Sequence, residues 1–374
     1  MPQVSVIIPT YNGELYISQA VDSVLAQSCD DYEIIVVDDG STDNTVAALQ
    51  PYRDRITYLY QANRKLPAAR NAGIRATRGE YLAFLDSDDL FLPHKLAAQA
   101  RCLDERPDVG LVASGHQYID EAGRLLQESR PWIGRPTITL ESILYGGLAP
   151  VHAVLLRRDW FERVGGFDEQ FAYCEDMDLW YRLALAGCPM EWVPAVVCQY
   201  RVHAHNMSRS PETHFSYLRR ALGKAFADPR LPDDLRARRA ELDAQIDLSE
   251  SARLLAGGWE EAARERVRRA AATNPALAAD NGRGLAEVVT GLQSSVWSDG
   301  RFPGFVMAVM AVDIPALGRT MATITAQKRF YTAFGERRAA DVRQAWLDVA
   351  RHDPAWLLNR GGWSILRQAI FRNF

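Results

Sequence analysis

The alternation of apolar segments with helically spaced segments restricts the fold of this chain more than any other feature of its sequence. Apolar segments rich in β-branched or aromatic residues predict strands at residues 4–9, 32–40, 56–61 and 81–89. Apolar residues at helical spacing predict helices at residues 13–28, 41–52 and 66–79. Continuously apolar strands joined by helices form a parallel sheet with helices on both faces. The first two hundred residues are therefore expected to form an α/β domain.

Polar residues stand at the points where these strands end. The clusters are Thr10-Tyr11-Asn12, Asp38-Asp39 and Asp86-Ser87-Asp88. Ligands of parallel sheets bind at the carboxyl ends of the strands. We therefore expect the three clusters to lie along one edge of the sheet and to form its binding site.

The rest of the chain has two parts that differ in composition. The first contains a predicted strand at residues 109–120 that turns at 121–123, a strand, a short helix and a Gly-Gly turn at 151–169, a helix at 175–188 and a pair of strands at 190–203. After residue 210, alanine and arginine dominate and β-branched segments disappear, which indicates helices. We expect an α/β domain over residues 1–210 and a helical C-terminal domain over residues 211–374.

Charge and cysteine content argue against several classes of protein. The chain has 43 Lys and Arg against 47 Asp and Glu, a formal net charge of -4, so nucleic-acid binding is not expected. The five cysteines form no CxxC pair, which disfavours a zinc site and a disulfide framework and suggests a reducing compartment. The first residues do not have the pattern of a signal peptide, and no apolar stretch reaches about 18 residues. We expect a cytoplasmic protein without a membrane span.

Three carboxylates at the end of the fourth strand, those of Asp86, Asp88 and Asp89, need a cation nearby because like charges repel. Asp86 and Asp88 are two residues apart in an extended segment, so both can point the same way. Their oxygens suit Mg²⁺ or Mn²⁺ shared with substrate phosphates. Two alternatives stay open: a solvated acidic turn, and an aspartyl phosphotransferase, in which Leu90 would replace the usual Thr or Val.

Other polar residues could serve a nucleotide or a reacting hydroxyl group. Asp39 could accept hydrogen bonds from a base or ribose, or could cap a helix. Tyr11 could stack on a base, although the GxGxxG of a dinucleotide site is missing. Asp176 could be a general base, or an acid that complements the helix dipole. His203 could join the aspartates as a metal ligand, or could be structural.

Together these segments resemble the family 2 glycosyltransferases, which have the GT-A fold. The resemblance runs through VSVIIPTYNGELYISQAVDSVLAQ, YEIIVVDDGSTDNT, AARNAGIRATRGEYLAFLDSDD, GGFDEQFAYCEDMDLWYR and YRVHAHNMS. It covers about residues 3–208, and its specificity lies in the order and spacing of the motifs. The C-terminal region lies outside the resemblance.

The resemblance implies a site for a nucleotide-diphosphate sugar, with a UDP-sugar favoured. The residues that it assigns to nucleotide binding are Pro9, Thr10, Tyr11, Asp39, Arg70 and Ser87. Among them, Asp39 would hold the base and Arg70 would approach the phosphates. Asp86 and Asp88 would carry Mn²⁺ or Mg²⁺, with His203 completing the metal shell, and Asp89 would support the turn.

The resemblance also implies a mechanism and a class of acceptor. Gly165, Gly166 and Glu175 would lie on the acceptor side, and Asp176 would be the catalytic base. A single displacement inverts the anomeric configuration. The acceptor would be a glycan or a lipid-linked glycan in surface polysaccharide or glycoconjugate synthesis. The alternative is a non-catalytic nucleotide-sugar binder or assembly scaffold on the same fold.

The last segment, NRGGWSILRQAIFRNF at residues 359–374, mixes apolar side chains with arginines. Such a segment could form an amphipathic helix on an anionic membrane, which would place the protein at the inner face of the membrane. It could equally dock onto the protein's own core.

Overall fold

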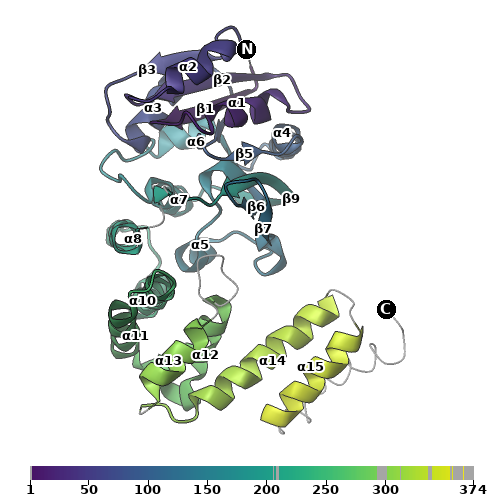
Figure 1. The fold of residues 1–374 in the computed structure, drawn as a ribbon, viewed down its shortest axis with the longest axis vertical. Helices are drawn as coiled ribbons and strands as arrows, with labels where there is room; N and C mark the ends of the chain where they lie inside the picture. Colours follow the sequence, from purple (N-terminus) through teal and green to yellow (C-terminus); the bar gives the residue numbers. More distant parts are fainter. Residues whose placement is uncertain are drawn as a thin grey trace. The chain divides into compact units, whose positions relative to one another are not determined.

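The chain folds into two units, residues 1–237 and residues 238–374, in the computed structural model (Figure 1). The structure describes residues 2–204, 206–207, 210–292, 301–311, 313–335, 339–353, 356 and 365. Each unit has apolar clusters of its own.

A mixed β-sheet forms the frame of the first unit. Its strands are β1 (Val4–Thr10), β2 (Tyr32–Asp38), β3 (Thr57–Tyr60), β4 (Tyr81–Phe84), β5 (Leu90–Phe91), β6 (Leu111–Ile119), β7 (Leu125–Ser129), β8 (Val154–Arg157) and β9 (Met190–Arg201). They are joined in the order β3-β2-β1-β4-β8-β6-β9-β5, and β7 pairs with β6. Strands β3, β2, β1 and β4 are parallel, as predicted, whereas β8 runs antiparallel to both of its neighbours.

The first unit also contains nine helices and three 3₁₀ turns among its described residues. They are α1 (Ile17–Leu25), α2 (Thr45–Leu49), α3 (Leu66–Ala76), α4 (Lys95–Glu105), α5 (Leu140–Gly146), α6 (Arg158–Arg163), α7 (Glu175–Leu185), α8 (Pro211–Ala227) and α9 (Asp233–Ala237), with 3₁₀ turns η1 (Gln50–Tyr52), η2 (Pro131–Ile133) and η3 (Val151–Ala153). The face of α1 formed by Ile17, Ala20, Val21 and Val24 is buried. This is the i, i+3, i+4, i+7 spacing that predicted the helix.

The continuous apolar pattern of the first strands follows from burial on both faces. Ile34 and Val36 of β2 point into one apolar cluster, while Ile35 and Val37 point into another. Alternate residues of a strand face opposite sides, so both sides of β2 are covered. The sequence pattern therefore reports a central strand.

The parallel register brings the polar strand ends to one edge. Thr10 of β1 is level with Asp38 of β2, and the Asp39 N–H donates to the Thr10 carbonyl oxygen at 2.8 Å. On the other side of β1, the Leu85 N–H donates to the Ile7 carbonyl oxygen at 3.0 Å. The turn that begins at Asp86 thus starts beside the end of β1, as the sequence predicts.

The prediction of two strands over residues 190–203 is wrong. One strand, β9, covers Met190–Arg201 and pairs with β6 and with β5. The register of β9 against β6 shifts near Gly115. Such an irregularity bends a strand without ending it, so the segment stays one strand. The predicted turn at 121–123 is confirmed, since it joins β6 to β7.

The second unit is helical, as predicted. Its elements are α10 (Arg239–Ala256), α11 (Glu260–Thr273), η5 (Pro275–Leu277), α12 (Ala279–Leu292), α13 (Phe302–Met310), α14 (Leu317–Gly335) and α15 (Ala339–His352). Gly258 separates α10 from α11 with a φ of 84°, which glycine adopts readily. Apolar side chains of α10 to α14 form one core cluster.

The change of composition at residue 210 marks a helix that belongs to the first unit. Lys224 of α8 lies 2.7 Å from Asp168 and 2.8 Å from Asp178, so α8 is bound to α7 and to the loop before it. The units divide after Ala237, beyond the boundary expected at residue 210.

The membrane hypothesis concerns a segment of which the structure describes Ile365 alone, so that hypothesis stays a prediction. Within the described ranges, the helices are too short or too polar to cross a bilayer.

One stability prediction arises from Lys95 at the start of α4, which is fully buried. Its Nζ donates to Gln99 Oε1 at 2.5 Å and to the Val154 carbonyl oxygen at 3.2 Å, and burial lowers its pKa to about 7. Between about pH 7 and pH 10.5, Lys95 therefore binds a proton more strongly in the unfolded chain than in the folded protein. The burial of Lys95 destabilises the folded state fully below pH 7, and this destabilisation decreases as pH rises toward 10.5. Lys95→Met is expected to raise the free energy of unfolding by about 2–4 kcal/mol at pH 7.

Urea unfolding at pH 7 and pH 9.5 measures this effect, and the gain should shrink at the higher pH. The matched control is Arg101→Met, because Arg101 lies on the same helix with a side chain that is 78% exposed. Its effect should not depend on pH. An equal gain for Lys95→Met at both pH values would contradict the prediction.

Candidate active site

The acidic turn after β4 lies at the edge of the sheet where β1 and β2 end. The Asp89 N–H donates to the Asp86 carbonyl oxygen at 3.0 Å and closes the turn. The side chains of Asp86 and Asp88 are 29% and 30% exposed, and Ser87 between them is partly exposed. The Asp89 side chain is 2% exposed. Two carboxylates therefore face the site and the third faces the interior.

The cation beside the acidic turn is Arg70 of α3, whose side chain is 1% exposed. One terminal nitrogen lies 2.5 Å from Asp86 Oδ1, and the other pairs with Glu175 Oε1. Burial opposes a charged guanidinium, but the surrounding carboxylates, Asp86 first and then Glu175 and Asp176, hold the pKa of Arg70 above its usual range. Arg70 thus joins the turn to α7, and its contact with phosphates stays a prediction.

The first turn of α7 brings two more acids to Arg70. Cys174 precedes the helix in a left-handed conformation, with φ 56° and ψ 28°. Burial raises the pKa of Glu175 to about 7 and also raises the pKa of Asp176, in both cases against the attraction of Arg70. Asp176 is nevertheless partly exposed. An accessible carboxylate with a raised pKa has the properties of a general base.

The third acid of α7, Asp178, is bound to other parts of the protein. Its carboxylate lies 2.7 Å from Arg182 and 2.8 Å from Lys224, and its side chain is 2% exposed. Asp178 therefore ties α7 to α8 and does not reach the acidic turn through these contacts.

His203 and Asp88 place a nitrogen and an oxygen ligand side by side. His203 Nε2 lies 2.9 Å from Asp88 Oδ2, and the ring of Tyr16 lies against the imidazole with centroids 5.5 Å apart. With Asp86, the group offers two carboxylates and an imidazole. This donor set fits Mn²⁺ or Mg²⁺ when a diphosphate supplies further oxygens.

A second group of possible ligands shares Asp86. One atom each of Asp86, Asp89 and His152 lie within 4.8 Å of one another. Asp89 Oδ2 and His152 Nδ1 are 2.9 Å apart in the protein interior. Burial raises the pKa of Asp89 to about 6; burial opposes protonation of His152, but Asp89 raises the pKa of that imidazole well above its usual range. Asp89 therefore already lies against an imidazole whose charged form it favours.

The residues expected to hold the base lie at the ends of β1 and β2. Asp39 Oδ1 accepts hydrogen bonds of 2.7 and 2.8 Å from the loop at 61–64, and its other oxygen accepts none from a described residue. Tyr11 is 52% exposed, so a base could stack on its ring. Thr10 has a buried hydroxyl without a hydrogen-bond partner in the described part of the chain, and Pro9 is buried beside it.

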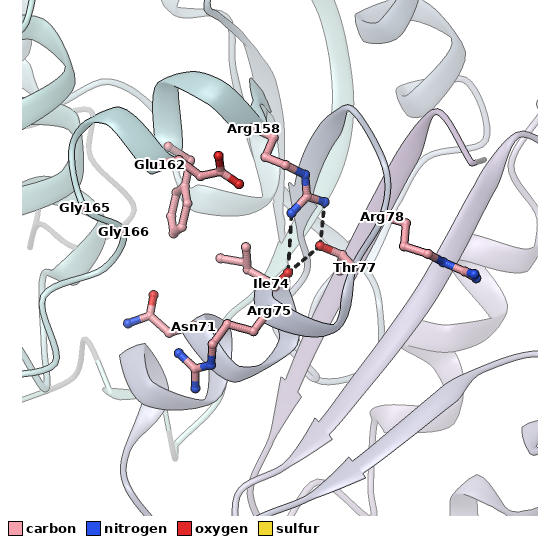
Figure 2. A pocket seen from close by; sticks show the side chains of 10 residues that line it. Asn71, Ile74, Arg75, Thr77, Arg78, Arg158, Glu162, Gly165 and Gly166 are labelled. Carbon is pink, nitrogen blue, oxygen red and sulfur yellow. Dashed lines mark hydrogen bonds between the residues drawn. The ribbon is translucent and has the colours of Figure 1, made fainter.

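Gly165 and Gly166 line a pocket of about 710 Å³ beside α3 and α6 (Figure 2). Their φ angles are 85° and 77°, a region that favours glycine. In the same pocket, Arg158 donates to Thr77 Oγ1 at 2.6 Å and to the Ile74 carbonyl oxygen at 3.5 Å. The glycines thus form the turn that ends α6, and their contact with an acceptor stays a prediction.

Sequence reasoning missed two residues that contact the acidic turn, His152 and Arg201. The Arg201 N–H donates to Asp89 Oδ1 at 2.8 Å, and its Nε donates to the Asp88 carbonyl oxygen at 3.0 Å. Both residues are far from the turn in the sequence, and the sheet brings them to it. The one available signal was an arginine at the end of an apolar strand, two residues before His203.

Comparison with known proteins gives the family. The model of glycosyl transferase family 2 matches residues 5–165. An uncharacterized glycosyltransferase of Nostoc sp. is 32% identical over 272 residues, which are 66% of this chain and 79% of that protein. An uncharacterized glycosyltransferase of Rickettsia felis is 33% identical and the chondroitin synthase of Escherichia coli 31%, over 57% and 60% of this chain. The chain spans about a third of each of these two, 36% and 33%.

Solved structures show the fold. TarS of S. aureus, in complex with UDP-GlcNAc, aligns with a TM-score of 0.53 at 20% identity over 87% of this chain and 91% of that one. The mannosyltransferase PcManGT of Pyrobaculum calidifontis, in complex with GDP-Man and Mn²⁺, aligns with a TM-score of 0.55 at 22% identity over 86% and 87%. The chain thus belongs to glycosyl transferase family 2 and has the GT-A fold.

Proposed function

We propose that this protein is an inverting, metal-dependent glycosyltransferase that moves a sugar from a nucleotide-diphosphate sugar to an acceptor hydroxyl group. The observation that carries the proposal is that Arg70 contacts both the acidic turn and the first turn of α7. This buried arginine binds Asp86 of the acidic turn and Glu175 of α7, next to Asp176. In such an arrangement a cationic group can stabilise the negative charge of a leaving diphosphate, and a neighbouring carboxylate can accept the proton of a hydroxyl group.

The donor is proposed to lie along the ends of β1, β2 and β4. Tyr11 would stack on the base, the unoccupied oxygen of Asp39 would accept a hydrogen bond from it, and Ser87 would lie toward the ribose and phosphates. We favour a UDP-sugar. The two solved neighbours were bound to UDP-GlcNAc and to GDP-Man, which supports a nucleotide-sugar donor and leaves the base to be measured.

The residues proposed to hold Mn²⁺ or Mg²⁺ are Asp86, Asp88 and His203. When bound, the cation supplies Lewis-acid stabilisation of the leaving diphosphate. Asp86 would be held in place by Arg70, which keeps one of its oxygens at 2.5 Å and leaves the other for the metal. His203 would be oriented by the ring of Tyr16.

Asp176 is proposed as the catalytic base. Its carboxylate would take the proton of the acceptor hydroxyl group while the acceptor oxygen attacks the anomeric carbon and the bond to the diphosphate breaks. A single displacement of this kind inverts the anomeric configuration. Glu175, paired with Arg70, would carry charge on the acceptor side without acting as the base.

The acceptor is proposed to be a glycan or a lipid-linked glycan of surface polysaccharide or glycoconjugate synthesis. The similarity to the chondroitin synthase of E. coli supports a polysaccharide acceptor. A cytoplasmic location, with peripheral contact at the inner face of the membrane through residues 359–374, belongs to the same proposal. The alternative is a non-catalytic nucleotide-sugar binder on this fold, against which the presence of Asp176 argues.

Calorimetric titration with UDP, GDP, CDP and dTDP, each with and without Mn²⁺, tests the proposal. We expect one nucleotide to bind in a metal-dependent manner. Asp88→Ala should weaken that binding at least about tenfold in the presence of Mn²⁺, because it removes one ligand of the cation, and should leave metal-free binding unchanged.

Asp108→Ala is the matched control, since this aspartate is 65% exposed and pairs with Arg106 on the surface. It should bind nucleotide as the unmodified protein does. If no nucleotide binds the unmodified protein, the proposal fails; if one binds but no donor is turned over, the non-catalytic binder gains support.

A further inference from the structure

Asp89 differs from the other acids of its turn because the protein encloses both of its carboxylate oxygens. Oδ1 accepts the Arg201 N–H at 2.8 Å, and Oδ2 lies 2.9 Å from His152 Nδ1. The residue as a whole is 1% exposed. A carboxylate removed from water in this way is costly unless cationic and hydrogen-bonding partners compensate it.

His152 is placed to provide that compensation. It lies in η3, directly before β8, and is 0% exposed. The ring of Tyr200 lies against it with centroids 5.7 Å apart, which fixes the plane of the imidazole. His152 thus holds Asp89 from the side of β8, whereas Arg201 holds it from the end of β9.

These contacts connect two proposed metal ligands that are distant in the sequence. Arg201 binds Asp89 through its backbone and the Asp88 carbonyl oxygen through Nε at 3.0 Å. His203, two residues later, lies 2.9 Å from the Asp88 side chain. The distance between Asp88 and His203 therefore depends on the attachment of Arg201 to the turn, and Asp89 is the centre of that attachment.

We propose that the buried His152–Asp89 pair is a positioning device that sets the acidic turn against the end of β9 and so fixes the arrangement of Asp86, Asp88 and His203. This inference rests on the proposed metal-dependent donor site. His152 and Asp89 act through other residues and do not touch the cation. Both oxygens of Asp89 are already occupied, and neither side chain faces the open part of the site.

The test replaces each member of the pair with an uncharged residue of similar volume, His152→Gln and Asp89→Asn. Calorimetry then measures nucleotide binding with and without Mn²⁺. We expect about a 10- to 100-fold loss of the Mn²⁺-dependent affinity in each variant and unchanged metal-free binding, as for residues that orient metal ligands. Having two variants guards against one that fails to fold, which thermal unfolding detects.

His116→Gln is the matched control. His116 lies on the neighbouring strand β6, is 6% exposed and makes no hydrogen bond through either ring nitrogen in the described part of the chain. Burial first, and then the nearby His152, lower the pKa of His116 to about 3, so its replacement by glutamine perturbs the same core without changing the charge beside the pair. It should change thermal stability and leave the Mn²⁺-dependent affinity unchanged. An equal loss in His116→Gln would overturn the inference, because the effect would then be general to the core.

Pulsed electron paramagnetic resonance of bound Mn²⁺ separates positioning from ligation. We expect the coupling of a histidine nitrogen to Mn²⁺ to persist in His152→Gln and to disappear in His203→Gln. Loss of the coupling in His152→Gln would overturn the inference in favour of direct ligation. Unchanged Mn²⁺-dependent affinity in both pair variants would overturn this inference alone, whereas absence of metal-dependent binding in the unmodified protein would overturn the proposed function as well.

Discussion

Asp176→Asn is expected to reduce sugar transfer by about 10²–10⁴-fold while donor binding stays within about twofold of the unmodified protein. Asparagine has nearly the same volume but cannot accept the acceptor's proton. Asp176 lies on α7, whereas the residues proposed to hold the base and the metal lie at the strand ends and on β9's C-terminal side. The measurements are turnover with the donor identified by calorimetry, and the Kd of that donor.

Asp178→Asn is the control, because Asp178 is another acid in the same helical turn. Its partners are Arg182 and Lys224, so its replacement should lower the thermal midpoint and leave kcat within a few-fold. A fully active Asp176→Asn variant would exclude Asp176 as the base. Equal losses of kcat in the two variants would indicate that the turn is merely structural.

The pH dependence of transfer follows from the same acids. Burial raises the pKa of Asp176, so the base is protonated and inactive at a pH where an exposed aspartate would already be ionised. Activity should therefore rise with pH, with a midpoint above the usual range of aspartate. A pH–rate profile for kcat, with the nucleotide affinity measured in parallel, checks this; a profile that is flat down to pH 4 would contradict it.

The parallel half of the sheet could be predicted because each of its strands and helices has its own pattern in a short stretch of sequence. The apolar segment at residues 34–37 is continuous since both faces of β2 are buried, and Asp38 and Asp39 follow it because the strand ends at the site. The position of β9 could not be predicted in this way. It runs between β6 and β5, and no short-range pattern reports which strands are neighbours.

The residues of the candidate site also fall into those that the sequence could predict and those that it could not. Asp86, Asp88 and Asp39 could be found because each lies shortly after the end of a predictable apolar strand. The contacts of His152 could not, because a histidine before a short strand is unremarkable until the order β4-β8-β6-β9 places it under the acidic turn. From the sequence, a metal ion was expected to compensate the negative charge of the acidic turn. In the structure, Arg70 of α3 also compensates it, by pairing with Asp86.

Arg70→Met is expected to lower the free energy of unfolding by about 3–5 kcal/mol at pH 8, because it leaves the buried carboxylate of Glu175 without its cation. Burial raises the pKa of Glu175 to about 7, although the positive charge of Arg70 opposes this rise. Without Arg70, the pKa of Glu175 is expected to rise further. The folded state then binds a proton more strongly than the unfolded state. The destabilisation should therefore be small near pH 4–5 and should grow as pH rises through 7.

Urea unfolding at pH 5, 6, 7 and 8 measures this dependence, with Arg158→Met as the control. Arg158 donates its hydrogen bonds to Gly79, Ile74 and Thr77, none of them a carboxylate, so its loss should destabilise the protein equally at each pH. If the destabilisation by Arg70→Met were also independent of pH, the positive charge of Arg70 would not be what stabilises the neighbouring carboxylates. The expected steep response would mean that the positive charge of Arg70 compensates the buried carboxylate of Glu175, and that this charge joins the first turn of α7 to Asp86 of the acidic turn.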